Sequence, residues 1–131
     1  MKITIHKESI DVVAAVIKKN NLFLLANRSF EAGSPGIWEF PGGKVEENET
    51  FVSALIREIE EELSLKIQVG DKITTIDLKT SDKYIFVHYF HAFIVSGNIT
   101  LNVHSEFKWA ARAQLSTFKY IDGDRYILKH L

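Results

Sequence analysis

The chain has 131 residues, 46% of them hydrophobic and 11% aromatic, which favours one globular domain over residues 1–131 and excludes a disordered chain. It contains no cysteine, which excludes disulfides, thiolate zinc sites and a cysteine nucleophile. Sixteen Lys and Arg against seventeen Asp and Glu give a formal net charge of −1, so no overall basic field can hold a nucleic-acid polymer.

The first half of the chain predicts two strands, a loop and one long helix. Residues 11–17 are almost all β-branched or Ala, and residues 22–26 form a second apolar run, which indicates two buried strands joined by an asparagine turn. Glycine and proline recur from Gly33 to Gly43, as in a functional loop. From about Glu49 to Leu63, helical spacing places these apolar residues in one stripe: Val52, Leu55, Ile56, Ile59 and Leu63.

The second half predicts further strands and a short terminal helix. The expected strands are residues 73–78 and 84–95, paired around a turn at 80–83, followed by 99–103 and 107–110. Residues 122–131 fit a short helix capped by Asp122 or Asp124. No repeat or linker interrupts these elements, so we expect one α+β domain.

The amino terminus does not have the pattern of an export signal. Residues 1–7 hold no long apolar run, and the stretch from Val12 to Ile17 is too short to cross a bilayer. We therefore expect a cytoplasmic protein with no membrane partner, as a monomer or a homodimer.

The acidic residues are concentrated in one segment. Between Glu46 and Glu62 there are seven glutamates and one cation, Arg57, so this segment carries −6 and the rest of the chain +5. Glu58, Glu61 and Glu62 share one face of the predicted helix, where like charges repel and oppose the helix dipole by roughly 0.3–1 kcal/mol each. A bound divalent cation would reverse that sign, because Mg²⁺ prefers carboxylate oxygens together with water and phosphate. The alternative is a solvated acidic face.

A tight glycine turn precedes this helix. Pro41-Gly42-Gly43 permits close approach of backbone amides and carbonyls to the carboxylates. After Gly43 come five residues, Glu49, seven residues and the run Arg57-Glu58-Ile59-Glu60-Glu61-Glu62-Leu63-Ser64-Leu65. This pattern resembles the Nudix box, Gly-x5-Glu-x7-Arg-Glu-U-x-Glu-Glu-x-Gly-U, where U is a bulky aliphatic residue. Ser64 stands where the family usually has the glycine that ends the helix.

The resemblance extends over most of the chain. Residues 36–46 are similar to the segment G-x-W-E-F-P-G-G-K-x-E of MutT-like Nudix members, and Arg28 matches an arginine that such members place against the nucleotide. Trp109, followed fifteen residues later by Asp124, stands where they carry a tryptophan and a base-reading Asn or Asp. The chain thus resembles the 8-oxo-dGTP or CTP pyrophosphohydrolase type, which implies the Nudix α/β/α sandwich with a mixed β-sheet.

The resemblance also implies a site and a cofactor. Nudix enzymes hydrolyse a nucleoside diphosphate linked to another moiety, by attack of water on phosphorus with Mg²⁺ or Mn²⁺. The implied metal ligands are the Gly42 carbonyl, Glu58, Glu61 and Glu62. The implied catalytic residues are Glu58, which would orient or deprotonate the water, Arg57 and Glu61. The implied substrate-binding residues are Arg28, Glu39, Phe40, Pro41, Gly42 and Asp124.

Several positions leave alternatives open. Arg57 and Glu49 would orient the carboxylates from behind, or Arg57 would form an ordinary helix ion pair. Some MutT-like members place a metal-binding Glu six residues before the tryptophan, and that position here is Val103. Glu106 could replace it, or fewer metals are bound.

Other ring-bearing residues carry less information. His88 and His91 are three apart on a predicted strand, so their side chains would point to opposite faces and argue against a zinc site. Aromatic side chains could stack on a base or belong to the core: Trp38, Phe40, Tyr84 and Phe86.

The leading expectation is a Mg²⁺-dependent pyrophosphohydrolase that converts a nucleoside triphosphate, including an oxidised or modified one, to the monophosphate and pyrophosphate. Asp124 is compatible with cytosine or a modified purine, because a carboxylate accepts hydrogen bonds and its protonated form also donates. One alternative is a Nudix hydrolase of dinucleoside polyphosphates or nucleotide sugars. Another is a catalytically silent nucleotide-binding module, against which the complete set of Nudix-box charges argues.

Overall fold

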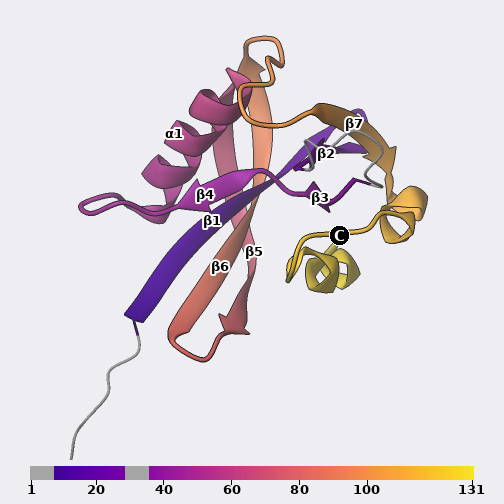
Figure 1. Ribbon diagram of the computed structural model, residues 1–131. Coiled ribbons are helices and arrows are strands. Elements are labelled where there is room, and N and C mark those ends of the chain that lie inside the picture. The colour runs from indigo at the N-terminus through magenta and orange to yellow at the C-terminus, as the bar shows by residue number, and fades with distance from the viewer. Residues whose placement is uncertain (1–7, 29–35) are drawn as a thin grey trace, which may run out of the picture.

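Long strands dominate the chain, as Figure 1 shows for this computed structural model, which describes residues 8–28 and 36–131. Residues 1–7, and residues 33–35 of the predicted loop, lie outside the described residues. Within the two described ranges the elements are β1 (Glu8–Lys19), β2 (Leu22–Asn27), β3 (Trp38–Glu39), β4 (Gly42–Lys44), α1 (Phe51–Leu63), β5 (Lys66–Lys79), β6 (Lys83–Ser96), β7 (Glu106–Ala111) and the 3-10 helices η1 (Arg112–Thr117) and η2 (Asp124–His130).

The first strand is central to a mixed sheet. β1 runs parallel to β6 and antiparallel to β4, and its last residues pair antiparallel with β2. The strand order is β3-β2-β1-β6-β5, with β4 paired to β1 and β7 paired to β2. Asn20 and Asn21 have φ angles of 52° and 62°, as a tight hairpin turn requires, which confirms the asparagine turn between the first two strands.

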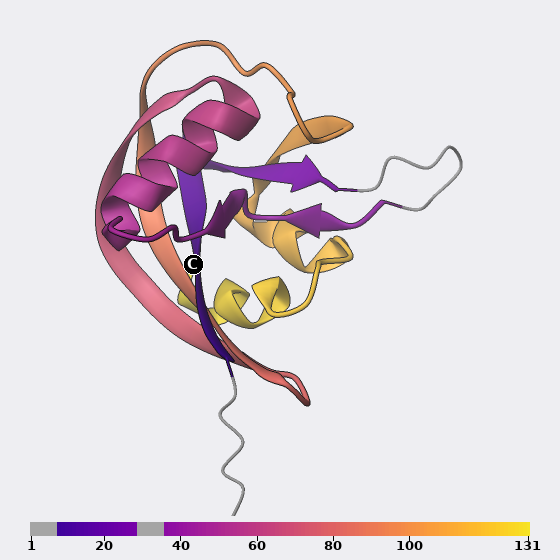
Figure 2. The same cartoon turned by 60° about the vertical axis from the view of Figure 1, so that its left-hand side comes forward.

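Each face of β1 carries its own hydrophobic core, because successive side chains of a strand point to opposite faces. Val13 and Ile17 pack in the cluster that contains Leu55 of α1. Ala14 packs in the cluster that contains Ile127 of η2. Figures 1 and 2 show α1 on one side of the sheet and the two 3-10 helices on the other. This layering confirms the expected α/β/α sandwich with a mixed sheet.

The long helix forms where the apolar spacing predicts it, with Thr50 as its N-cap. The Thr50 side chain accepts a hydrogen bond from Ser53 N at 3.0 Å, and Thr50 N donates to Ser53 Oγ at 3.0 Å. The buried face differs from the predicted stripe, since Val52 and Ile56 are exposed. The side chains of α1 that are buried are Ala54, Leu55, Ile59, Glu62 and Leu63, so a carboxylate lies on the inner face.

The helix ends at Ser64 in the left-handed conformation, with φ 58° and ψ 32°. This conformation suits glycine and is unfavourable for serine, because Cβ crowds the backbone. Asn102 stabilises the end of the helix by donating from its side chain to Glu61 O at 2.8 Å and to Ser64 Oγ at 3.2 Å. The sequence departure at Ser64 is therefore accommodated without loss of the cap.

Ser64→Gly should raise the free energy of unfolding by about 0.5–1 kcal/mol, because glycine adopts the left-handed conformation without steric cost. Urea unfolding checks this expectation. Ser64→Ala is the matched control, since it removes the hydroxyl but keeps Cβ, and it should be no more stable than the wild type. Equal stability of the glycine and alanine variants would contradict the role assigned to the backbone conformation.

Three sequence predictions about elements are wrong in detail. β5 begins at Lys66 instead of residue 73. Residues 99–103 form no strand, because Thr100 N and Asn102 N donate to the carbonyls at the end of α1, at 2.9 and 3.0 Å, and not to a neighbouring strand. The terminal helix is of the 3-10 type with Gly123 at its N-cap and no side-chain cap, so neither Asp122 nor Asp124 caps it.

Candidate active site

The close contact between β4 and α1 depends on two glycines. A Cβ on Gly42 would lie 1.9 Å from Val13 O, so glycine is needed for β4 to approach β1. A Cβ on Gly43 would lie 2.4 Å from Glu58 Cδ, so glycine is also needed for the Glu58 carboxylate to reach the β4 backbone. The turn and the acidic helix that the sequence pattern joins are thus in direct contact.

Arg57 joins most of the acidic residues around this contact. Its Nε and Nη2 donate to both oxygens of Glu49 at 2.7 and 2.9 Å. Its Nη1 donates to Glu58 Oε1 at 2.9 Å and to Glu61 Oε2 at 3.2 Å, and Nη2 also donates to Lys44 O at 3.1 Å. The bond from Arg57 lowers the pKa of Glu49 to about 2, and Glu49 raises the pKa of Arg57. A guanidinium that is hydrogen-bonded to three carboxylates makes more contacts than an ordinary helix ion pair.

Glu62 is the buried carboxylate of the helix. Burial, together with the nearby charges of Glu39 and Glu58, raises its pKa to about 8. Its Oε2 is buried and has no hydrogen-bond partner among the described residues. A buried carboxylate oxygen without a partner is costly unless it is protonated or bound to a cation.

His104 faces Glu62 and Glu39, and it was not among the residues predicted from the sequence. Its Nε2 lies 2.8 Å from Glu39 Oε2 and 3.7 Å from Glu62 Oε2. One ligand atom from each of the three residues lies within 4.8 Å of the others, and all three residues are buried. The available signal was its position directly after Val103, where this chain lacks the loop glutamate that some MutT-like members carry. Val103 itself is 45% exposed.

Five of the six predicted substrate-binding residues line a cavity of about 190 Å³ next to these carboxylates. Arg28 Nε donates to Glu39 Oε1 at 2.8 Å, which places both side chains on this cavity. Asp124 is buried and accepts from Phe40 N at 2.9 Å and from Tyr89 Oη at 2.5 Å. Despite these bonds, burial raises the pKa of Asp124 to about 7. The described part of the chain lines the cavity with Arg28, Glu39, Phe40, Gly42 and Asp124, among others.

Pro41 is placed differently from the other predicted residues. It is fully buried, and its carbonyl accepts from Ala15 N at 2.8 Å, so it fastens the turn to β1 and does not line the cavity. Trp38 is also a core residue, packed edge-on against Phe118 with ring centroids 5.4 Å apart. Tyr84 and Phe86 stack on each other at 6.4 Å.

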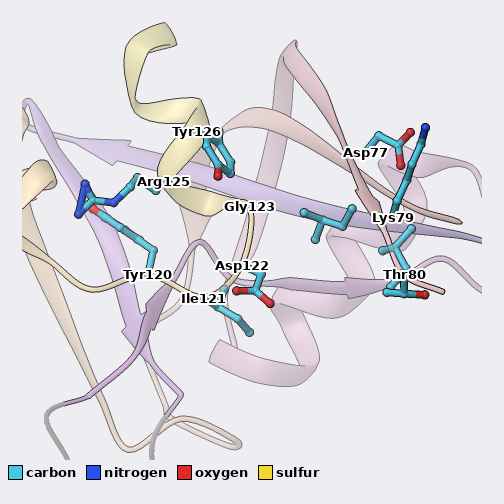
Figure 3. A pocket seen from close by; sticks show the side chains of 11 residues that line it. Asp77, Lys79, Thr80, Tyr120, Ile121, Asp122, Gly123, Arg125 and Tyr126 are labelled. Carbon is cyan, nitrogen blue, oxygen red and sulfur yellow. The ribbon is translucent and has the colours of Figure 1, made fainter. Parts of the chain in front are cut away.

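A larger cavity of about 570 Å³ adjoins the first (Figure 3). Figure 3 shows Asp77 and Lys79 of β5 on one side of it and Asp122 and Tyr126 on the other. The two cavities share four lining residues, Leu78, Ile85, Ile121 and Asp122. Space for a ligand therefore continues beyond Asp124, toward the tip of the β5–β6 hairpin.

The remaining polar candidates have partners elsewhere. Glu106 Oε1 accepts from Asn27 Nδ2 at 3.2 Å, and Glu106 is not part of the group formed by Glu39, Glu62 and His104. His88 Nε2 lies 2.8 Å from Asp11 Oδ1, and its ring stacks on Phe51 at 4.1 Å. In this structure Glu106 is thus bonded to Asn27 and lies apart from that group. His88 is a packing residue with a hydrogen bond to Asp11.

The metal-free protein should lose stability as pH rises from about 5 to 8. The pKa values of Glu62 and Asp124 are raised to about 8 and about 7, so both groups hold protons in the folded state that the unfolded chain has released. Folding then becomes less favourable as pH rises through these values, by on the order of 3 kcal/mol. Thermal unfolding in EDTA at a series of pH values from about 5 to 8 measures this loss of stability. Glu62→Gln should flatten the profile, and Mg²⁺ should do the same by favouring the carboxylate; a wild-type profile parallel to that of the variant would contradict the assignment.

The comparisons with known proteins show the family of this chain. The NUDIX domain family model matches residues 8–131. The chain is 32% identical over 120 residues to the CTP pyrophosphohydrolase of Escherichia coli (strain K12), covering 92% of this chain and 89% of that protein. It is 37% identical over 86 residues to the 8-oxo-dGTP diphosphatase of Proteus vulgaris, covering 64% of this chain and 76% of that protein.

A solved structure shows the same architecture. The solution structure of the Escherichia coli ORF135 protein matches with a TM-score of 0.84 at 30% identity, covering 95% of this chain and 89% of the other. This chain belongs to the Nudix hydrolase family. Across residues 8–28 and 36–131, no helix has the length and apolarity needed to span a bilayer.

Proposed function

We propose that this chain is a divalent-cation-dependent, cytoplasmic pyrophosphohydrolase that converts a nucleoside triphosphate, including an oxidised or modified one, to the monophosphate and pyrophosphate. The observation that carries the proposal is the contact of Glu58 with the β4 glycine turn, beside the cavity that Arg28, Glu39 and Asp124 line. The phosphate groups of the substrate would lie at the end of this cavity near Glu58, and the base would lie at the end near Asp124. The relatives named as acting on CTP and 8-oxo-dGTP support a triphosphate substrate.

The residues present fit a Mg²⁺ or Mn²⁺ ion. Carboxylate oxygens are the ligands these ions prefer, and Glu62 Oε2 is a buried oxygen without a partner among the described residues. The residues that would hold the ion are the Gly42 carbonyl, Glu58, Glu61 and Glu62. When bound, a divalent cation neutralises phosphate charge and makes a bound water more acidic.

Glu58 is the residue best placed to act on the attacking water. Arg57 donates to its Oε1, which orients the carboxylate and leaves Oε2 for a further partner. The water oxygen forms a bond to phosphorus, the bond from phosphorus to the bridging oxygen breaks, and the water proton passes to Glu58. Arg57 and Glu49 act behind the carboxylates, because their mutual pair of hydrogen bonds fixes the guanidinium.

Asp124 is proposed to read the base. Asp124→Asn should change the ratio of kcat/KM values for CTP and 8-oxo-dGTP by about tenfold or more, because an amide presents one donor group where the acid presents an acceptor or a titratable proton. Asparagine keeps the shape and can still accept from Phe40 N, whereas Asp124→Ala would leave that donor unpaired. Steady-state kinetics on both substrates measures the ratio. An unchanged ratio would remove Asp124 from base recognition.

The experiment that tests the function is a product analysis. The purified protein is incubated with Mg²⁺ and a panel of normal and oxidised nucleoside triphosphates, nucleotide sugars and dinucleoside polyphosphates, and the products are separated by ion exchange. Monophosphate plus pyrophosphate from a triphosphate, abolished by EDTA, is the expected result. No turnover of any compound would favour a nucleotide-binding module without catalysis.

One observation favours a second substrate class. The larger cavity adjoins the proposed base site, so it offers room for a second moiety. Two cationic side chains, Lys79 and Arg125, line it together with two anionic ones, Asp77 and Asp122. A dinucleoside polyphosphate or a nucleotide sugar would use this space. Turnover of those compounds with little turnover of triphosphates would replace the leading proposal by this one.

A further inference from the structure

His104 lies between two buried carboxylates of the site, Glu39 and Glu62. Its side chain is 1% exposed, and those of Glu39 and Glu62 are 6% and 9% exposed. Its Nε2 is 2.8 Å from Glu39 Oε2 and farther, at 3.7 Å, from Glu62 Oε2. Because an ionised carboxylate can only accept, the geometry assigns the hydrogen to Nε2 and the hydrogen bond to Glu39.

Glu39 is held on both of its oxygens. Arg28 Nε donates to Oε1 at 2.8 Å, and His104 Nε2 donates to Oε2 at 2.8 Å. Two donors from separate parts of the chain leave the carboxylate a single orientation at the wall of the 190 Å³ cavity. Glu39 is therefore oriented before any ligand enters, which lowers the cost of binding.

The backbone on each side of His104 is fastened. Asn102 N donates to Glu62 O at 3.0 Å, at the end of α1. Ser105 N donates to Asn27 O at 3.1 Å, at the end of β2. These two hydrogen bonds attach the loop to α1 on one side of His104 and to β2, which precedes Arg28, on the other. The position of the imidazole therefore depends on both α1 and β2.

We propose that His104 is a positioning residue that orients Glu39 for contact with the nucleotide and so links the substrate cavity to the carboxylates of α1. The inference rests on the proposed function. A sequence pattern that looks for a loop glutamate at Val103 misses it, because the neighbouring side chain is the one that turns inward. The competing role is that of a nitrogen ligand to the metal, and the experiment separates the two.

The test compares two polar variants that place an amide donor at different points of the imidazole. In His104→Gln the amide nitrogen can reach the position of Nε2, whereas in His104→Asn it reaches only that of Nδ1, away from Glu39. Binding of CMP and 8-oxo-dGMP is measured by calorimetry in EDTA, so that no metal contributes. We expect His104→Asn to bind the preferred monophosphate about tenfold more weakly, and His104→Gln to stay within about threefold of the wild type.

A double-mutant cycle isolates the pair. In a Glu39→Gln background, His104→Asn should cause little further loss, because the carboxylate that it orients is gone. Thermal unfolding of each variant shows whether it has lost its fold. If His104→Asn has, the test is the comparison of monophosphate binding by His104→Gln and by Glu39→Gln. Equal affinity of the wild type and His104→Asn, or equal losses in both variants, would overturn the proposal.

Mn²⁺ binding, followed by electron paramagnetic resonance without nucleotide, gives the second readout. The positioning role predicts that His104→Asn binds Mn²⁺ within about threefold of the wild type. Weakened Mn²⁺ binding with unchanged monophosphate binding would overturn the proposal and make His104 a metal ligand. A wild type that neither binds these nucleotides nor hydrolyses a triphosphate would overturn the proposed function itself, which distinguishes the two failures.

Discussion

Glu58→Gln should lower kcat for Mg²⁺-dependent hydrolysis by about a thousandfold, because an amide cannot take the proton of the attacking water. The variant should fold normally. Its side chain occupies the same space against Gly43, and loss of one negative charge relieves repulsion at Glu62, whose pKa the Glu58 charge raises. Steady-state kinetics at saturating Mg²⁺ and thermal unfolding of the same preparation measure the two effects.

Glu60→Gln is the matched control for this experiment. Glu60 lies on the same helix but is exposed, and it is not among the carboxylates that Arg57 contacts. The control variant should retain kcat within about twofold. If Glu58→Gln kept more than a tenth of the wild-type kcat, Glu58 would not be the residue that activates the water.

Arg57→Lys should lower kcat by about a hundredfold, although it keeps the positive charge. Lysine has no planar fork and cannot donate to both oxygens of Glu49 while also reaching Glu58 and Glu61. The carboxylates then lose their fixed orientation, and a small misplacement of reacting groups is costly in rate. We also expect a loss of about 1–2 kcal/mol in the free energy of unfolding, measured by urea titration.

Arg112→Lys is the control for the loss of a guanidinium. Arg112 is exposed at the start of η1, away from the acidic helix, and its substitution should leave both kcat and stability close to wild type. If Arg57→Lys kept the wild-type kcat, Arg57 would be no more than an ordinary helix ion pair.

The local elements were predictable because their causes are local. The apolar runs of β1 and β2, the asparagine turn between them and the helical spacing before Leu63 each depend on neighbouring residues. The start of β5 and the absence of a strand at 99–103 depend on which backbone groups find partners across the fold. Residues 99–103 have a strand-like sequence, yet the open carbonyls at the end of α1 take Thr100 N and Asn102 N as donors.

The cluster of acidic side chains was predictable as a set, because the Nudix-box spacing puts its glutamates on one helix beside a glycine turn. Its inner geometry was not. Sequence spacing cannot tell which carboxylate is buried, and only the packing of α1 against the sheet makes Glu62 the buried one and leaves Glu61 exposed. Sequence spacing also cannot tell that Pro41 is buried in the core whereas Glu39 lines the cavity.

By itself, then, the sequence determined the family, the acidic helix and the identity of most residues proposed for the site, since these follow from residue types at fixed spacing. The tertiary structure alone decided that Asp124 is buried against Phe40 and Tyr89, and that His104 reaches Glu39 from 65 residues away in the chain. Such contacts join segments that no local pattern connects. The Asp124 contacts form because η2 packs in one core cluster with Phe40 and Tyr89. The His104 contact forms because the loop before β7 is bonded to the end of α1 and places the imidazole between two carboxylates.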